Sequence, residues 1–345
     1  MSPVESVHFK QDRSTRLREI ERVGVTKVED EYKDEIDEYQ KVLEMATIPD
    51  LAMMNLQPEL EWHMRPYLLD FLIESHISLN LLPQTLFLTV NLIDRYCSRR
   101  IVFKKHYQLV GCAALWIASK YEDKKDRIPN VRELKIMCCD AYEEDMFVQM
   151  EGHVLSTLEW SIGHPTAYHF LKQQLRYNCS PTLEHLSHYL AELAMFHKSF
   201  LGFPSSVIAS SASFLAQHVL SNKMSLPVCT SSAQESACVA LLAQFIMHTP
   251  SQSLQKKFSS PTFSQVGLIL QDYVARKNSA ALSFPPTPPA TSERGMPGFD
   301  SKDADEMTDA RYTGFNMPDP GASYMTPPCT PDEPCLPNFA AVQAC

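Results

Sequence analysis

Apolar residues along this chain recur every three or four positions, which is the spacing of one face of a helix. In the segment that follows Pro83 they are Leu86, Val90, Ile93 and Cys97. The segment from Tyr107 to Tyr121 is instead apolar nearly all round and interleaved with small residues, as in a helix that has neighbours on every side. Alternating β-branched runs and Asn-Gly or Asp-Gly hairpin pairs are absent from the sequence. The pattern therefore predicts an all-α protein.

A second series of helical segments follows Pro165. The pattern predicts helices over Thr166–Tyr177, Thr182–Phe200, Pro204–Leu220, about Ser232–His248 and about Thr262–Lys277. The central helix of each series carries small residues, over Gly111–Ala118 in the first and Ala209–Ser213 in the second. Two blocks of about five helices, each built around such a central helix, indicate a duplicated all-α module.

The acidic stretch Glu29–Glu38 opens the part of the chain that we expect to fold. Apolar residues continue from it at helical spacing and predict an amphipathic helix: Tyr32, Ile36, Tyr39 and Leu43. We divide the chain accordingly into four parts. These are a flexible N-terminus (residues 1–28), a first block with its preceding helix (residues 29–165), a second block (residues 166–280) and a tail (residues 281–345).

The uneven distribution of charged residues and prolines divides the 345 residues into a body and a tail. Residues 283–345 hold 12 of the 24 prolines and carry 9 acidic against 3 basic residues, and the whole chain has a formal net charge of −10. An acidic segment so rich in proline is expected to be disordered. The body is weakly acidic, which disfavours a nucleic-acid binder because phosphate contacts need a concentrated positive face.

Targeting and catalytic signals are missing from the sequence. No apolar run approaches the length of a membrane span, and Met1–Lys10 lacks the apolar core of a signal peptide. We therefore expect no membrane partner, and we expect the ten cysteines to be reduced thiols of the cytosol or nucleus. Because no Cys-x-x-Cys pair, Gly-rich phosphate loop or nucleophile elbow occurs, we expect no metal, no cofactor and no catalytic residues. The expected location is the nucleus and cytoplasm.

Four motifs of the first block resemble those of the cyclin family, in the order and spacing of that family. They are Met64–Leu72, Asn91–Tyr96, Gln108–Glu122 and Met150–Leu155. Pro204–Ala209 resembles a helix of the family's second box. Other segments are similar to fungal G1/S-specific cyclins of the Cln type: Leu86–Val90, Ala114–Ile117, Met137–Asp140 and Leu158–Ile162. The resemblance implies two tandem five-helix cyclin boxes with an N-terminal helix and a disordered C-terminal tail.

The same resemblance implies a regulatory subunit and not an enzyme. It indicates a G1 (G1/S) cyclin that binds and activates a cell-cycle cyclin-dependent Ser/Thr kinase. Lys120 and Glu151 match the paired kinase contacts of the family. Arg65 and Asp94 match a buried ion pair that ties the first helix of the box to the second.

Some cyclins dock substrate peptides in a shallow apolar groove of the first box. Positions of that groove are matched by Met64, Tyr67, Leu68, Phe71 and Gln108. Such a groove needs apolar side chains that are exposed. Tyr67 and Phe71 differ from the commonest residues of the family, and a partly buried helix face explains the same pattern.

Two tail segments, Phe284–Thr291 and Tyr324–Pro331, share one arrangement. Each contains Thr-Pro-Pro, an apolar lead-in and a second threonine four residues further on. They resemble the phosphodegrons read by F-box ubiquitin-ligase receptors, where two phosphates meet a cluster of arginines. The candidate phosphorylation sites are Thr287, Thr291, Thr326 and Thr330. The resemblance implies that the bound kinase marks its own regulatory subunit for degradation.

Two alternative functions stay open at this point. A cyclin subunit of a transcription-related kinase would also use Lys120 and Glu151, but the segments around Cys138-Cys139 and Trp160 and the degron-like tail do not favour it. A cyclin-fold transcription factor would need a basic surface for DNA, and the acidic body argues against one.

Overall fold

The computed structural model describes residues 15–282, except 18, 22, 26, 29, 176–178 and 223–231. Within these residues every regular element is a helix, which confirms the predicted all-α fold. The four tail threonines (Thr287, Thr291, Thr326 and Thr330) and the predicted tail disorder lie outside the described residues. The described residues between 15 and 31 are helical, where the sequence predicted a flexible N-terminus. The segment is rich in arginine and glutamate, residues of high helix propensity, which favours the helix.

The first block packs around α6 (Tyr107–Glu122), as its small and apolar residues predict. Helices α4 (Arg65–Ser78), α5 (Pro83–Arg99) and α8 (Glu144–Thr157) surround α6, and α7 (Val131–Met137) packs on α8. Two helices precede this group: α2 (Lys33–Ala46) and α3 (Leu51–Met54). A Cβ atom at Gly111 would lie only 2.8 Å from Leu68 Cδ1, so the glycine allows α4 and α6 to approach closely.

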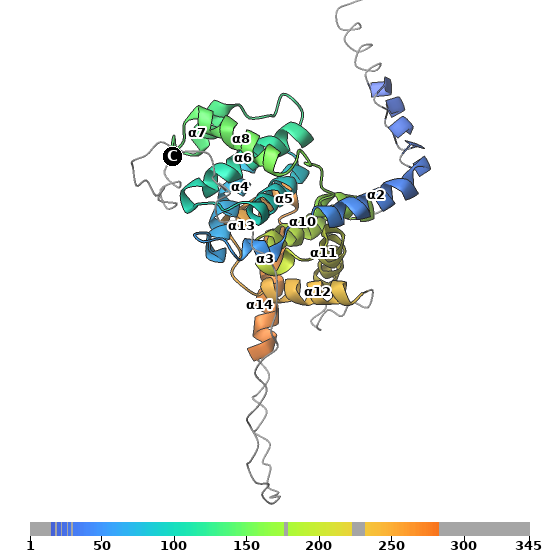
Figure 1. Ribbon diagram of the computed structural model, residues 1–345. Helices are drawn as coiled ribbons and strands as arrows, with labels where there is room; N and C mark the ends of the chain where they lie inside the picture. The colour runs from blue at the N-terminus through green and yellow to red at the C-terminus, as the bar shows by residue number, and fades with distance from the viewer. Residues whose placement is uncertain are drawn as a thin grey trace, which may run out of the picture.

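The second block repeats this plan around α11 (Ser205–Leu220), as Figure 1 shows. Helices α9 (Ala167–Gln174), α10 (Pro181–Met195) and α12 (Ala233–Phe245) pack against α11, and α14 (Val266–Leu282) packs against α10. Short 3-10 helices connect the elements of both blocks: Trp62–Met64, Lys104–His106, Lys198–Phe200 and Pro261–Phe263. The predicted helix over Thr182–Phe200 is thus divided, because α10 ends at Met195 and a 3-10 turn follows.

Prolines and polar caps fix where the helices begin. Pro66, Pro83 and Pro181 occupy the first turns of α4, α5 and α10, where a backbone N–H has no helical partner to lose. Asn130 forms a capping box at α7, accepting from Glu133 N while Glu133 accepts from Asn130 N. Local sequence chemistry therefore sets the helix boundaries on which the packing depends.

A sixth helix of the second block, α13 (Gln252–Phe258), was not predicted. It has only seven residues, too few for a periodic apolar pattern to stand out, and Ser251 caps it by accepting from Leu254 N. The helix joins the two blocks. The Ser251 hydroxyl donates to Asp70 on α4, and Lys257 Nζ lies 2.5 Å from Glu192 Oε1 on α10.

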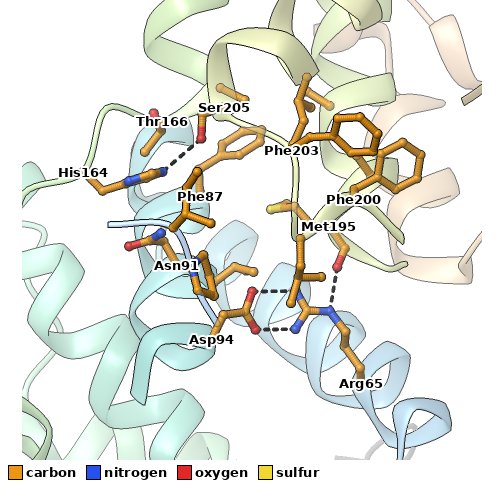
Figure 2. A pocket seen from close by; sticks show the side chains of 18 residues that line it. Arg65, Phe87, Asn91, Asp94, His164, Thr166, Met195, Phe200, Phe203 and Ser205 are labelled. Carbon is orange, nitrogen blue, oxygen red and sulfur yellow. Dashed lines mark hydrogen bonds and ion pairs between the residues drawn. The ribbon is translucent and has the colours of Figure 1, made fainter. Parts of the chain in front are cut away.

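Arg65 makes the central contact between the blocks. Its two terminal nitrogens bind both carboxylate oxygens of Asp94 on α5, and its Nε donates to the Met195 carbonyl at the end of α10, 2.7 Å away. Both charged side chains are almost fully buried. Figure 2 shows the three residues beside a cavity of about 90 Å³ that is lined by both blocks. The predicted Arg65–Asp94 pair is present, and it also reaches the second block.

Replacing Arg65 by alanine should lower the free energy of unfolding by about 3–5 kcal/mol, because Asp94 would be left buried and unpaired. Urea denaturation followed by circular dichroism measures the change. Arg132→Ala serves as the control, since Arg132 is exposed and pairs with Glu144 at 3.7 Å on the surface. The control should lose less than about 1 kcal/mol. Equal stabilities of the two variants would contradict the structural role of Arg65.

Candidate partner-binding site

Lys120 and Glu151, predicted from sequence to act together, meet on the surface of the first block. Lys120 lies in the last turn of α6 and Glu151 in the middle of α8, with Nζ and Oε1 2.6 Å apart. The side chains are 38% and 16% exposed, and Nζ also lies 3.2 Å from the centroid of the Trp116 ring. The pair is held in place from two sides and is still accessible to a partner.

A groove of about 560 Å³ lies at the end of α6, the helix that carries Lys120. Tyr121, the residue after Lys120, lines it together with Ile36 and Tyr39 of α2. Tyr121 is 57% exposed, and a Cβ atom at Gly163 would lie 3.0 Å from its hydroxyl. Ile36 and Tyr39 are exposed as well. The groove is thus lined by exposed aromatic and aliphatic side chains, and aromatic residues are enriched at the centre of protein–protein contacts.

Trp160 is a second exposed aromatic residue of the first block and lies on the segment that leaves α8. Its side chain is 69% exposed, and both Glu159 and Trp160 have positive φ angles, of 54° and 59°. Hydrogen bonds hold this turn: Trp160 N donates to Leu155 O at 2.9 Å, and Ser161 N donates to Leu158 O at 3.0 Å. The turn is therefore a fixed support for an exposed tryptophan.

Arg95 donates a hydrogen bond to the backbone of the same turn. It is buried on α5, and its Nη2 donates to the Ser161 carbonyl at 2.7 Å. Burial lowers the pKa of Arg95 to about 10, with a smaller contribution from the positive charge of Arg99. The guanidinium still carries its proton at neutral pH, so it remains a donor to the backbone of the turn.

Helix α2 forms the far wall of the groove and is anchored to the second block. The Glu44 carboxylate accepts from Ser206 N at 2.6 Å and from Ser206 Oγ at 3.0 Å, in the first turn of α11, where a negative charge is favourable. Gln40 Nε2 lies 2.8 Å from His169 Nε2 on α9. The groove is thus assembled from both blocks, so its shape depends on how they are joined.

The residues predicted to form a substrate-docking groove differ in exposure. Tyr67 is exposed and Met64 is half-buried, whereas Leu68, Phe71 and Gln108 are buried. Leu68 and Phe71 belong to the core of the first block and do not supply the exposed apolar surface that the prediction required. Docking of a substrate peptide at Tyr67 stays a prediction.

Sequence reasoning missed the contribution of Tyr121 and Trp160 to the surface. Both were used only as parts of motifs. Their position was the available signal, because Tyr121 directly follows the paired Lys120 and Trp160 closes the last turn of an amphipathic helix. A large aromatic residue at such a helix end is a candidate contact residue.

Two further kinds of site are absent from the part of the chain that the structure describes. No group of three or more His, Cys, Asp or Glu side chains there is placed to hold a metal ion. No described helix is both long and apolar enough to cross a membrane.

Two helical blocks that meet at the buried Arg65, with a groove lined by residues of both, define a tandem-repeat helical protein. The first block matches the family model of the cyclin N-terminal domain over residues 35–163, and the second matches that of the cyclin C-terminal domain over residues 165–272. The chain therefore belongs to the cyclin family, as the sequence motifs predicted.

Known proteins resemble the chain over parts of its length. It is 50% identical over 212 residues to the G1/S-specific cyclin CCN1 of Candida albicans, a match that covers 55% of this chain and 31% of that protein. It is 34% identical over 262 residues to the G2/mitotic-specific cyclin cdc13 of Schizosaccharomyces pombe, covering 73% of this chain and 53% of that one. A viral cyclin structure from herpesvirus saimiri aligns with a TM-score of 0.48 at 18% identity, over 71% of this chain and 98% of the other.

Two buried histidines, His76 and His188, and the half-buried His164 should make the protein sensitive to acid. Burial lowers the pKa of His164 to about 3, with a smaller effect of Arg95, and the pKa values of His76 and His188 fall equally far through burial and the nearby Lys257. Below the unfolded pKa of about 6.5, the unfolded chain binds protons that the folded chain excludes. The contribution of these neutral histidines to the free energy of unfolding is therefore complete above that pH. It decreases as the pH falls toward 3.

We expect each of these histidines to contribute a slope of up to about 1.4 kcal/mol per pH unit in this window. Urea denaturation at pH 7, 6 and 5 measures the slope. His164→Gln removes one titrating group and should reduce the slope. An identical slope for His164→Gln and the parent protein would rule out His164 as a contributor.

Proposed function

We propose that the protein is a G1 (G1/S) cyclin, the regulatory subunit that binds and activates a cell-cycle cyclin-dependent Ser/Thr kinase. The observation that carries this proposal is the accessible Lys120–Glu151 pair, which is followed in the chain by the exposed Tyr121. Membership of the cyclin family makes a kinase the expected partner of this surface. The chain spans about a third of the length of CCN1, so activity and partners belong to the proposal.

Charge and apolar area have separate tasks in the proposed complex. Lys120 and Glu151 exchange their mutual contact for charge-assisted hydrogen bonds to the groups that flank the mobile regulatory helix of the kinase, which fixes the register. Tyr121 and Trp160 supply apolar area that is exposed in the free protein and becomes buried on binding. Because this surface contacts the regulatory helix only in its active position, binding shifts the kinase population toward that position. Phosphoryl transfer itself belongs to the kinase.

Assignment to G1/S rests on motifs and relatives. Similar proteins include one named as G1/S-specific at 50% identity and one named as mitotic at 34% identity. The segments around Met137–Asp140 and Leu158–Ile162 match the former type.

The proposal includes a location in the nucleus and cytoplasm and selection of substrate peptides near Tyr67. A transcription-related kinase is the alternative partner, and identification of the kinase recovered with the full chain distinguishes the two.

Combining Lys120→Ala with Glu151→Ala should weaken binding to the recovered kinase by about 2–5 kcal/mol, which is about 30-fold or more in Kd. Surface plasmon resonance with the full chain measures Kd, and phosphorylation of histone by the complex measures activation.

Lys135→Ala with Glu143→Ala is the matched control. It removes a surface pair with a Nζ–Oε2 distance of 2.8 Å elsewhere on the same block, and Kd should stay within about twofold. Thermal unfolding checks that both variants are folded. Unchanged affinity of a folded Lys120/Glu151 variant would overturn the proposed site.

The proposal extends to turnover of the protein through its tail. Phosphorylation by the bound kinase would supply the charges that an F-box receptor recognises. Alanine at Thr287, Thr291, Thr326 and Thr330 should lengthen the half-life after translation arrest by about twofold or more, whereas Thr308→Ala with Thr313→Ala should not. Equal half-lives of the four-site variant and the parent would show that these threonines do not control turnover.

A further inference from the structure

A helical segment at residues 15–31 precedes α2, and its described residues are all exposed. Figure 1 shows the described part of this segment, in blue, projecting away from the two blocks. Its apolar residues lie open to solvent: Leu17 is 51%, Ile20 68% and Val28 55% exposed. At Gly24 a Cβ atom would meet nothing within 4 Å. The described residues of this segment are therefore helical, and their apolar side chains are not covered by the described part of the molecule.

Most of these residues share one face of the helix. Leu17, Ile20, Val28 and Tyr32 are separated by multiples of three or four positions, and the intervening Gly24 lies on the same side. An isolated helix of this length is marginal in water, and most helical stability in proteins comes from packing of such a face. A row of exposed aliphatic residues accordingly points to a partner.

The apolar face continues into the groove described above. Tyr32 N donates to Val28 O at 3.0 Å, and Ile36 N donates to Tyr32 O at 2.9 Å, so these three residues lie one helical turn apart. Tyr32 and Ile36 both line the groove. A partner that fills the groove is therefore placed to meet Val28 next, and then Ile20 and Leu17.

We propose that residues 15–31 extend the kinase-binding surface and that their apolar face packs on the kinase that occupies the groove. This inference rests on the proposed function. The matching cyclin N-terminal domain begins at residue 35, so the contact would be an addition by this chain to the domain shared with the family.

A second copy of the chain fits the same face less well. Seventeen residues span at most about 25 Å when helical, and a seam between two such segments is small compared with the roughly 1,200–2,000 Å² that a stable interface buries. As the margin of a larger kinase interface, the same face needs to supply only part of the contact.

The test uses the full chain with Leu17→Ala, Ile20→Ala and Val28→Ala combined. Alanine maintains helix propensity, so the change removes apolar area without breaking the helix. We expect Kd for the kinase to rise by about 10-fold or more, mainly through faster dissociation. Lys27→Ala with Asp30→Ala, at exposed polar positions of the same segment, is the matched control and should stay within about twofold.

Hydrogen exchange supplies a second readout. Amides of residues 15–31 should become protected when the kinase is added to the parent chain and should stay unprotected in the triple variant. Parental affinity of the triple variant would overturn the inference. So would sedimentation showing a dimer of the parent chain that the triple variant abolishes. If the Lys120/Glu151 variant loses the kinase and the triple variant does not, only this inference fails. If the parent chain binds no kinase, the proposed function fails with it.

Discussion

The buried contact of Arg65 with Asp94 and the Met195 carbonyl is the constraint on which the rest of the structure depends. One guanidinium satisfies a carboxylate on α5 and a backbone oxygen at the end of α10, so it joins two helices of the first block to the second. A buried ion pair contributes little net stability, and breaking it is costly. Its main effect here is to specify one arrangement of the two blocks.

The candidate site needs that arrangement because its walls come from different blocks. Tyr121 and the turn at Trp160 belong to the first block, whereas α2 is anchored to the second through Glu44 and Ser206. A rotation between the blocks would therefore move α2 relative to Tyr121. The groove and the segment at residues 15–31 form one continuous surface only while the junction at Arg65 is intact.

Sequence reasoning succeeded where the signal was local and failed where it depended on distant packing. Prolines and apolar spacing located the helices, and family motifs identified the pairs Arg65–Asp94 and Lys120–Glu151, which the structure brings together. The seven-residue α13 left no periodic pattern. The burial of Leu68 follows from its contact with α6 at Gly111, and the Glu44–Ser206 contact joins residues 162 positions apart. Neither contact has a local signature.

Several arginines that connect the helices and turns of this protein donate hydrogen bonds to backbone carbonyl groups. Arg65 donates to Met195 O, Arg95 to Ser161 O and Arg99 to Thr157 O. A carbonyl oxygen is present whatever side chain a position carries. The accepting positions are therefore free to change their side chains while the donors keep the same partner. These contacts therefore require arginine at positions 65, 95 and 99, whereas the side chains at the accepting positions can vary.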